Sequence, residues 1–273
     1  MYHDYFRLHE APFNITPDPR YLYLTDRHRE ALNHLLYGIR QRAGFICLTG
    51  EVGTGKTTLC RELLRRLDAP SYHTALILNP MLTETQLLRA IVDEFGIETK
   101  RRDRLGYLGL LNEFLLQINS SGQDVVLIID EAQDVSTRCL ELVRLLSNLE
   151  TESQKLLQIC LVGQPELRDK LARPALRQLA QRITVRYHLE RMNAAETADY
   201  LHHRLRVAGR TDTQATVRFD PDAVREIYRF SRGTPRLVNA IGDKALLAGY
   251  VYRTGSIDRR LVRLAADDLR EAG

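Results

Sequence analysis

The sequence lacks the features that mark disulfide-rich, membrane-spanning or low-complexity proteins. Its four cysteines form no Cys-x-x-Cys pair, and it contains no internal repeat or low-complexity segment. No apolar stretch approaches the roughly 18 residues that a helix needs to cross a bilayer. The first residues, MYHDYFRLHEAPF, show no basic segment followed by an apolar run, so they do not form a secretory signal. We expect a globular protein of cytoplasmic character.

The cysteines also lack the spacing of a metal or redox motif. Cys47, Cys60, Cys139 and Cys160 each lie in an apolar or helical stretch. We interpret them as small core or helix residues in a reducing compartment, with a metal or redox site as the alternative.

An excess of charge of one sign is missing too. The chain has 39 Lys+Arg against 35 Asp+Glu, a formal net charge of +4, with the two signs interspersed. This balance permits nucleic-acid binding but does not require it. With 273 residues, of which 44% are hydrophobic and 27% charged, the chain can form one large domain or two modest ones around a sizeable core.

The apolar segments divide the chain into three parts. Residues 1–25 are rich in proline and aromatic residues and predict an extended arm, leading to a helix that starts at Thr25 or Asp26. Short apolar runs then predict strands at 45–49, 74–78, 125–129, 156–162 and 183–189. Helical patterns alternate with them at 58–67, 84–95, 108–118 and 137–150. Short buried strands alternating with helices indicate a parallel sheet covered on both faces.

After about residue 190 the strand signals stop. The remaining patterns predict helices only, at 193–209, 220–231, 235–252 and 257–272. We therefore expect an arm (1–25), an α/β nucleotide-binding domain (26–190) with a five-stranded parallel sheet between helices, and a small all-helical lid (191–273).

The segment GEVGTGKT, at 50–57, matches the phosphate-binding pattern G-x-x-x-x-G-K-[ST] between a predicted strand and a predicted helix. Its glycines allow backbone N–H groups to curl around phosphates at a helix N-terminus. Lys56 is expected to reach the β- and γ-phosphates, and the Thr57 hydroxyl to bind Mg²⁺. The alternative is a glycine-rich turn with a chance lysine. The residues expected to bind the nucleotide are Gly50, Glu51, Val52, Gly53, Thr54, Gly55, Lys56, Thr57, Thr58 and Asp130.

A pair of carboxylates follows the strand at 125–129, in the segment VVLIIDEAQDV. Asp130 closes the strand at the end where parallel sheets bind ligands, so we expect it to bind Mg²⁺ together with Thr57. Glu131 is suited to polarising a water molecule for attack on the γ-phosphate; its alternative role is a helix-terminal charge. Because such a pair favours water as the nucleophile, we expect ATP hydrolysis rather than transfer to an acceptor hydroxyl.

With these residues placed, the chain resembles the AAA+ ATPases of the general secretion pathway A type, near the origin-recognition and transposition-helper branch. The segments that carry the resemblance are PFNITPDPRYLYLT, REALNHLLYGI, LTGEVGTGKTTL, LIIDEAQ, LVGQPEL, LRQLAQRI and GTPRLVNAIGDKALLAGY. The preference for ATP over GTP rests on this resemblance and on the lack of an Asn-Lys-x-Asp guanine-reading motif.

The resemblance implies further catalytic residues. Gln164 matches a sensor that orients the attacking water, with a simple turn residue as the alternative. Arg236, in GTPR, matches a lid arginine coupled to the γ-phosphate; the alternative is a solvated arginine at a helix end. Arg182 matches an arginine finger that acts on a neighbouring subunit, with Arg177 in reserve, which implies an oligomer. Asn79 matches a polar switch that holds the catalytic glutamate inactive.

Other features leave alternatives open. The basic run KRRDR at 100–104 suits contact with nucleic-acid phosphates or an anionic lipid surface, or forms a solvated loop. His202 and His203 diverge on a helix and cannot share a metal without further ligands. Tyr21 and Tyr23 either flank an adenine or pack in a core. The segment NPMLTET contains no aromatic-hydrophobic-glycine loop of the kind that grips a threaded polypeptide, which argues against a threading motor.

We therefore expect a Mg²⁺-dependent ATPase that forms a nucleotide-dependent homo-oligomer, as a ring or a filament. The resemblance implies a role in assembling a bacterial cell-envelope system for secretion, pili or exopolysaccharide export, with a protein partner in an inner-membrane complex. It implies a cytoplasmic protein peripheral to the inner membrane, whose longer relatives continue into a membrane span and a cell-wall-binding domain. The alternatives are a DNA-associated regulator of the transposition-helper type and a nucleotide-dependent binding switch with little hydrolysis.

Overall fold

The chain folds into two compact units. The computed structural model describes residues 2–14, 18–68, 70–150, 154–209 and 216–271. The α/β unit comprises Asp26–Glu51 and Lys56–Leu189, and the helical unit comprises Met1–Thr25, Val52–Gly55 and Glu190–Gly273. Residues 1–25 therefore group with the C-terminal helices.

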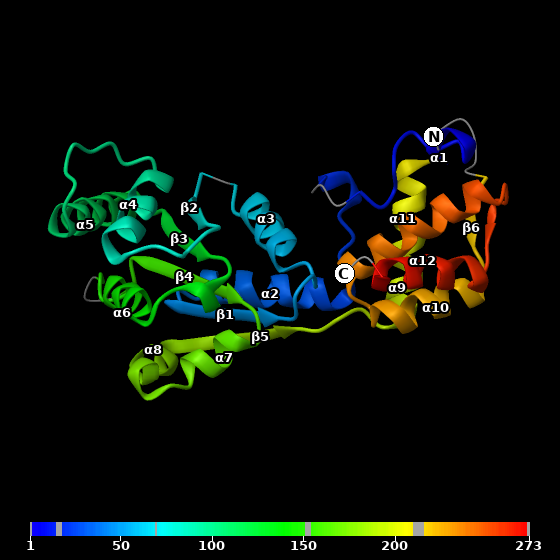
Figure 1. The fold of residues 1–273 in the computed structure, drawn as a ribbon. Helices are drawn as coiled ribbons and strands as arrows, with labels where there is room; N and C mark the ends of the chain where they lie inside the picture. Colours follow the sequence, from blue (N-terminus) through cyan, green and yellow to red (C-terminus); the bar gives the residue numbers. More distant parts are fainter. Residues whose placement is uncertain (1, 15–17, 69, 151–153, 210–215, 272–273) are drawn as a thin grey trace. The chain divides into compact units, whose positions relative to one another are not determined.

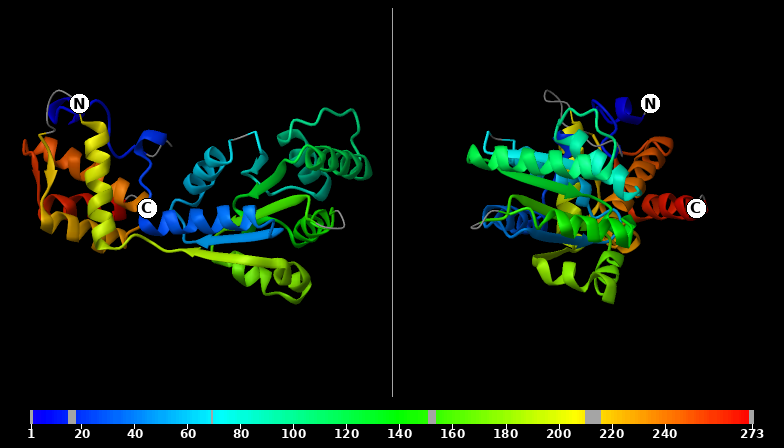
Figure 2. Two further views of the ribbon diagram at one scale, coloured as in Figure 1. Left: turned by 180° about the vertical axis from the view of Figure 1, so that it is seen from behind. Right: turned by 90° about the vertical axis from the view of Figure 1, so that its left-hand side faces the viewer.

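The α/β unit is built on a five-stranded parallel sheet with the order β2-β3-β4-β1-β5 (Figure 1). The strands are β1 (Phe45–Gly50), β2 (Tyr72–Ile77), β3 (Asp124–Ile129), β4 (Leu157–Gly163) and β5 (Ile183–Leu189). Helices lie on both sides of the sheet (Figure 2). They are α2 (Asp26–Arg40), α3 (Lys56–Arg66), α4 (Glu84–Glu94), α5 (Arg104–Ser120), α6 (Thr137–Leu146), α7 (Glu166–Leu171) and α8 (Arg177–Arg182), with short 3-10 turns η2 (Ala132–Asp134) and η3 (Pro174–Leu176).

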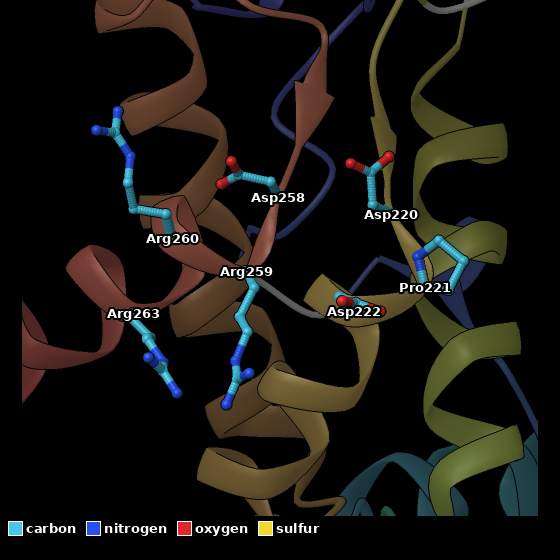
Figure 3. Close-up of a pocket in the computed structure, with 7 residues that line it drawn as sticks. All are labelled: Asp220, Pro221, Asp222, Asp258, Arg259, Arg260 and Arg263. Atoms are coloured by element: carbon cyan, nitrogen blue, oxygen red, sulfur yellow. The ribbon is translucent and has the colours of Figure 1, made fainter.

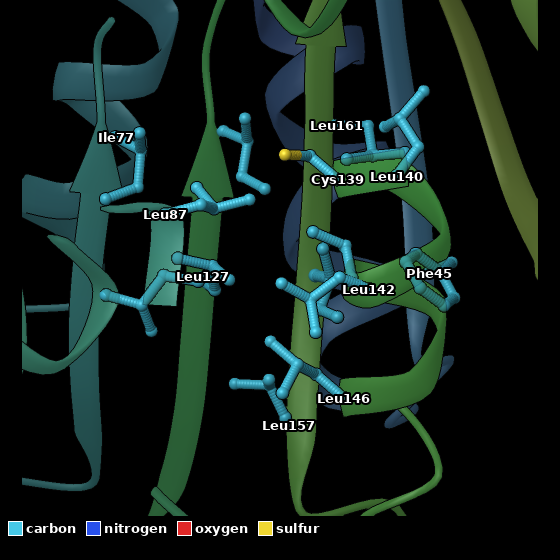
Figure 4. Packing of buried hydrophobic residues seen from close by; sticks show 14 of the residues in the cluster. Phe45, Ile77, Leu87, Leu127, Cys139, Leu140, Leu142, Leu146, Leu157 and Leu161 are labelled. Carbon is cyan, nitrogen blue, oxygen red and sulfur yellow. The ribbon is translucent and has the colours of Figure 1, made fainter. Parts of the chain in front are cut away.

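The central strands are apolar because both faces of the sheet are covered. Every residue of β1 and β4 is buried. On one face, alternate side chains such as Leu127 and Leu161 pack with residues of α4, α5 and α6. Figure 4 shows these two leucines together with residues of α4 and α6. On α2, a Cβ built on Gly38 would lie 2.7 Å from Cδ1 of Ile46. The missing side chain lets this helix lie close to the sheet.

The helical unit contains α9 (Ala194–Ala208), α10 (Pro221–Ser231), α11 (Pro235–Val251) and α12 (Arg259–Glu271), together with α1 (Tyr2–Tyr5) and the turn η1 (Pro19–Tyr21). Phe6, Leu8 and Phe13 are buried in the core of this unit. The first residues are thus anchored by apolar side chains and include two short helical turns, where the sequence had predicted an extended arm.

The expected architecture is confirmed, with several local differences. The second strand is Tyr72–Ile77 rather than 74–78, and Leu78 lies outside it with 48% of its surface exposed. The helix expected over 137–150 ends at Leu146. Among the described residues after 190, the regular elements are helices except for β6 (Arg218–Phe219) and β7 (Ser256–Ile257), which pair in parallel. The expectation of helices only was wrong there, because two residues are too few to give a strand pattern.

The four cysteines are buried and free. Burial raises the pKa of Cys47 to about 11 and that of Cys160 to about 12, so both are neutral thiols at neutral pH. Across the described residues we find no cluster of three or more His, Cys, Asp and Glu side chains able to hold a metal. The described helices also include none whose length and apolar character would let it cross a membrane.

Candidate nucleotide-binding site

The phosphate loop joins β1 to α3, and its backbone requires glycine at two positions. Gly53 has a φ of 75° and Gly55 a φ of 97°, a region that side-chain-bearing residues rarely adopt. Lys56, the first residue of α3, is buried, and its Nζ donates to the carbonyl oxygens of Gly50 at 2.8 Å and Glu51 at 3.0 Å. The lysine side chain therefore folds back along the loop.

Burial dominates the electrostatics of Lys56. Desolvation lowers its pKa, and the negative charges of Glu131 and Asp130 partly offset this effect. The remaining loop residues differ in exposure: Thr54 is buried, Val52 is 54% exposed and Thr58 faces solvent on α3. The Lys56 ammonium is thus a buried cation with backbone carbonyls as its hydrogen-bond partners and two acidic side chains nearby. Such a group is suited to bind an anion, which would replace the carbonyls as its partner.

The two expected magnesium ligands lie in contact. Asp130 follows β3 and is buried, and its Oδ2 accepts a hydrogen bond from the Thr57 hydroxyl at 2.6 Å. Its Oδ1 accepts from the backbone N–H of Glu131 at 2.9 Å. A hydroxyl and a carboxylate are the oxygen ligands that Mg²⁺ takes beside nucleotide phosphates and water. The two side chains therefore fit a magnesium ion whose other ligands come from outside the protein.

Glu131 sits in a left-handed backbone conformation, with φ 50° and ψ 38°. Such residues are costly and cluster at functional sites. Its Oε2 accepts hydrogen bonds from Nε2 of Gln133 at 2.7 Å and Nε2 of Gln164 at 3.1 Å. The structure thus brings the expected base Glu131 and the expected sensor Gln164 together, through neighbouring strands β3 and β4.

Gln133 was not singled out by the sequence. Its side-chain oxygen accepts from the backbone N–H of Gln164 at 3.0 Å, so it links both expected residues. The only signal for it is its place in the segment DEAQ, two residues after Glu131.

Asn79 lies on the surface after β2, and its Oδ1 accepts from the backbone N–H of Met81 at 3.5 Å. In the described part of the chain the side-chain partners of Glu131 are Gln133 and Gln164, and Asn79 is not among them.

Arg182 ends α8, and its guanidinium is bound within its own chain. Nη1 donates to Oγ of Ser147 at 2.8 Å and to Oδ1 of Asn148 at 2.5 Å, just after α6. Arg177, the reserve candidate, begins α8 and is exposed, and it makes no hydrogen bond or ion pair to the described residues. The two arginines are therefore held differently.

Arg236 belongs to the helical unit, where it is the second residue of α11 and is exposed. A Cβ built on Gly53, in the same unit, would lie 3.0 Å from Cβ of Arg236. The two backbones thus approach closely, with glycine at the loop position.

The tyrosines of the first segment pack within the helical unit. Tyr21 is buried, with the Arg204 guanidinium 4.4 Å from its ring centroid, and its hydroxyl donates to Glu10. Tyr23 packs against Tyr200 and His203. These contacts support the core-packing interpretation of both tyrosines.

The basic run at 100–104 is partly structural. Asp103 caps α5 by accepting from the backbone N–H of Gly106 at 2.9 Å, and Arg104 pairs with Glu84 at 2.7 Å. Lys100 and Arg102 are exposed loop residues.

The helical unit carries two hollows, of about 440 and 490 Å³, lined by charged side chains of α10 and α12. Figure 3 shows the first, which is lined by three aspartates, three arginines and Pro221. Neither hollow includes a residue of the phosphate loop, so neither is the expected nucleotide site.

The sequence is similar to a known domain and to a known protein. A family model described as an AAA domain matches residues 39–171. The chain is 46% identical over 267 residues to general secretion pathway protein A of Aeromonas hydrophila, a match that covers 97% of this chain and 48% of that protein. The chain therefore spans about half the length of this relative.

Solved structures of low sequence identity share the fold. Cdc6p of Pyrobaculum aerophilum aligns with a TM-score of 0.71 at 19% identity, covering 94% of this chain and 70% of that one. The ORC2 protein of Aeropyrum pernix, solved as ADPNP–ADP complexes, aligns with a TM-score of 0.65 at 18% identity, covering 95% and 71%. The chain thus carries an AAA domain over residues 39–171, is similar along 97% of its length to general secretion pathway protein A, and shares its fold with Cdc6p and ORC2.

Proposed function

We propose that this protein is a Mg²⁺-dependent ATPase. The observation that carries the proposal is the contact between Thr57 and Asp130 at 2.6 Å, with Glu131 directly following. Two oxygen ligands for a metal thus lie beside a lysine that can bind phosphate and a carboxylate that can accept a proton from water. A related fold, the ORC2 protein of Aeropyrum pernix, was solved with ADPNP and ADP, which supports a nucleotide as the ligand.

Each residue has a defined part in the proposed reaction. Lys56 binds the β- and γ-phosphates, and Thr57 and Asp130 hold the magnesium ion, which neutralises charge on the phosphates when bound. Glu131 accepts a proton from the attacking water, whose oxygen bonds to the γ-phosphorus as the bond to the ADP oxygen breaks. Gln164 orients that water. Arg236 of the helical unit responds to the γ-phosphate.

Turnover is proposed to need a homo-oligomer, as a ring or filament. An arginine finger contributes only when it faces the nucleotide of a neighbouring subunit, and Arg182 and Arg177 are the candidates. Because Arg182 donates to Ser147 and Asn148 of its own chain, acting as a finger requires it to use its remaining guanidinium N–H groups or to leave these partners.

The cellular role is proposed from the relative of 46% identity, whose name places it in the general secretion pathway. We propose that ATP turnover serves the assembly of a bacterial cell-envelope system, with a partner in an inner-membrane complex and the protein at the cytoplasmic face. A DNA-associated role is the second candidate, because a chain of the Drosophila ORC solved on DNA shares the fold, with a TM-score of 0.70 at 18% identity.

Steady-state ATP hydrolysis across a range of protein concentrations, with and without duplex DNA, tests these proposals. Specific activity that rises with protein concentration and ignores DNA supports an oligomeric ATPase of the envelope. Stimulation by DNA that salt abolishes would support the DNA-associated role instead. ATP binding without turnover at any concentration would leave a binding switch and refute the hydrolytic proposal.

A further inference from the structure

Gln133 connects two residues that the proposed reaction uses. Its amide nitrogen donates to Oε2 of Glu131 at 2.7 Å, while its amide oxygen accepts from the backbone N–H of Gln164 at 3.0 Å. The side chain of Gln164 donates to the same Oε2 at 3.1 Å. Glu131, Gln133 and Gln164 therefore form a closed ring of hydrogen bonds that joins the ends of β3 and β4.

The amide group of Gln133 has no freedom left within this ring. Its nitrogen also donates to Oδ2 of Asp134 at 3.0 Å, so both of its N–H groups are used. Its backbone carbonyl accepts from Nζ of Lys170, on α7, at 2.8 Å. A Cβ built on Gly163 would lie 2.7 Å from Oε1 of Gln133. The space that the amide occupies thus exists because residue 163 has no side chain.

Both amide donors bind the same oxygen of Glu131. Within the described part of the chain, no residue donates a hydrogen bond to Oε1. A carboxylate held firmly by one oxygen points its other oxygen in a fixed direction, and a proton acceptor is effective only at the correct position.

We propose that Gln133 is a positioning residue: together with Gln164 it fixes Oε2 of Glu131 and so presents Oε1 to the attacking water. This inference rests on the proposed ATPase function. Because Gln133 is tied to the backbone of Gln164 and to Lys170, the orientation of Glu131 follows the position of the turn between β4 and α7.

The first test compares turnover and ATP affinity in Gln133→Ala with those of the wild-type protein. We expect kcat to fall roughly 10- to 100-fold, because the acceptor is misplaced, while ATP affinity stays within about two-fold. Gln117→Ala removes an exposed amide from α5 and serves as the matched control, with unchanged kcat. An unchanged kcat in Gln133→Ala overturns the proposal. So does a higher one, which would mean that the amides restrain Glu131.

Gly163→Ala tests the same contact without changing any polar group. Its Cβ displaces the Gln133 amide, so we expect a loss of kcat like that of Gln133→Ala and no further loss in the double variant. Additive losses would show that Gly163 acts through other neighbours and would count against the ring.

A measurement without nucleotide separates this inference from the proposed function. The side-chain ¹⁵N resonance of Gln133, identified by its absence in Gln133→Ala, should shift in Glu131→Ala in the nucleotide-free protein. No shift overturns the hydrogen bond to Glu131, whether or not the protein hydrolyses ATP. Lack of turnover in the wild-type protein refutes the proposed function instead, and with it the positioning role in turnover.

Discussion

At the scale of single residues, the proposed dependence on Mg²⁺ rests on the Thr57 hydroxyl and the Asp130 carboxylate. Thr57→Val keeps the branched shape and removes only the hydroxyl. We expect ATP affinity in the presence of Mg²⁺ to fall roughly 10- to 100-fold, as for other losses around a metal site, while affinity in EDTA stays unchanged. Titration of a fluorescent ATP analogue under both conditions measures this. Equal losses with and without the metal would contradict a role for Thr57 in holding Mg²⁺.

Glu131 allows a second test at this scale. In Glu131→Gln the side chain keeps its size but loses its ability to accept a proton. We expect kcat to fall roughly 10²- to 10⁴-fold with ATP binding retained, measured by steady-state turnover and equilibrium binding. Turnover close to that of the wild-type protein would identify Glu131 as a helix-terminal charge.

Whether a site residue could be predicted depends on how far its partners lie from it in the sequence. Lys56, Thr57 and Asp130 stand in short patterns whose spacing indicates their chemistry, so they could be nominated before their positions were known. The role of Gln133 depends on β3 lying next to β4, which no local pattern contains. Asn79 was nominated by resemblance, but its hydrogen bond is to the backbone of Met81.

At the scale of elements, the start of α11 depends on a single glycine. Gly233 has a φ of 72°, and a Cβ built there would lie 1.8 Å from the carbonyl oxygen of Met192. Gly233→Ala should destabilise the helical unit by roughly 3 kcal/mol or more, from a left-handed alanine plus a clash with backbone that cannot move cheaply. Urea unfolding followed by hydrogen exchange in α9 and α11 measures this.

Gly122 provides the control for that prediction. Its φ is 73°, but a Cβ built there has no atom within 4 Å. Gly122→Ala should therefore cost only the strain of the backbone, about 1–2 kcal/mol. Equal effects of the two substitutions would mean that the contact with Met192 relaxes without cost.

A buried carboxylate joins α10 to α12. Glu226 is 4% exposed and accepts hydrogen bonds from Arg229 and Arg263, both at 2.7 Å, and from Arg259 at 3.3 Å. Arg259 and Arg263 are seen in Figure 3. Burial alone would raise the pKa of Glu226, but the hydrogen bond from Arg263 and the charges of Arg229 and Arg259 outweigh it, so its pKa lies below the ordinary value.

The lowered pKa of Glu226 predicts how the effect of Glu226→Gln on stability depends on pH. Because the folded-state pKa is lowered, Glu226 stabilises the helical unit above its unfolded pKa of about 4.3, and this stabilisation is lost as the pH falls through the folded value. Glu226→Gln should lower the unfolding free energy at pH 7 by roughly 1–2 kcal/mol, a value reduced by the half-exposed arginines. The difference from the wild-type protein should shrink below pH 4. A difference independent of pH would assign the effect to packing.

Four of the five strands were predicted to within one residue of their observed bounds. The buried, mainly apolar runs of β1, β3 and β4 allowed this, and β5 was predicted equally well although it is only partly buried. The strand β2 begins with Tyr72 and His73, whose polar atoms hid its first residues. The helix α6 ends early although its apolar pattern continues, because Ser147 and Asn148 turn the chain and bind Arg182. That contact comes from α8 and is not visible in the local sequence.

At the scale of the whole molecule, the question is which arginine would act between subunits of the proposed oligomer. If Arg182 is the finger, Arg182→Ala should keep ATP affinity and lose roughly 10³-fold or more in kcat, and Arg177→Ala should lose little. The reverse result would assign the role to Arg177. Turnover and equilibrium ATP binding, measured at a protein concentration that gives maximal specific activity, decide between them.

Mixing two inactive variants tests whether the finger works between copies. Glu131→Gln retains the arginine, and Arg182→Ala retains the acceptor, so a mixture should regain turnover at interfaces that combine one intact copy of each. Ser147→Ala controls for the contact within the chain, since it removes a partner of Arg182 without removing its charge. Mixtures that stay inactive, with Ser147→Ala as impaired as Arg182→Ala, would show that Arg182 serves the fold.

The site residues of the α/β unit follow the carboxyl ends of three adjacent strands, β3, β4 and β1. In a parallel sheet the opposite edge carries the connections that enter these strands. One of these connections is the turn that precedes β3. It contains Gly122, and a Cβ built on this residue has no atom within 4 Å. An inserted peptide tag or a cysteine carrying a fluorophore at this turn should leave the chemistry untouched. A label attached at this turn would allow assembly of the proposed oligomer to be followed during ATP turnover.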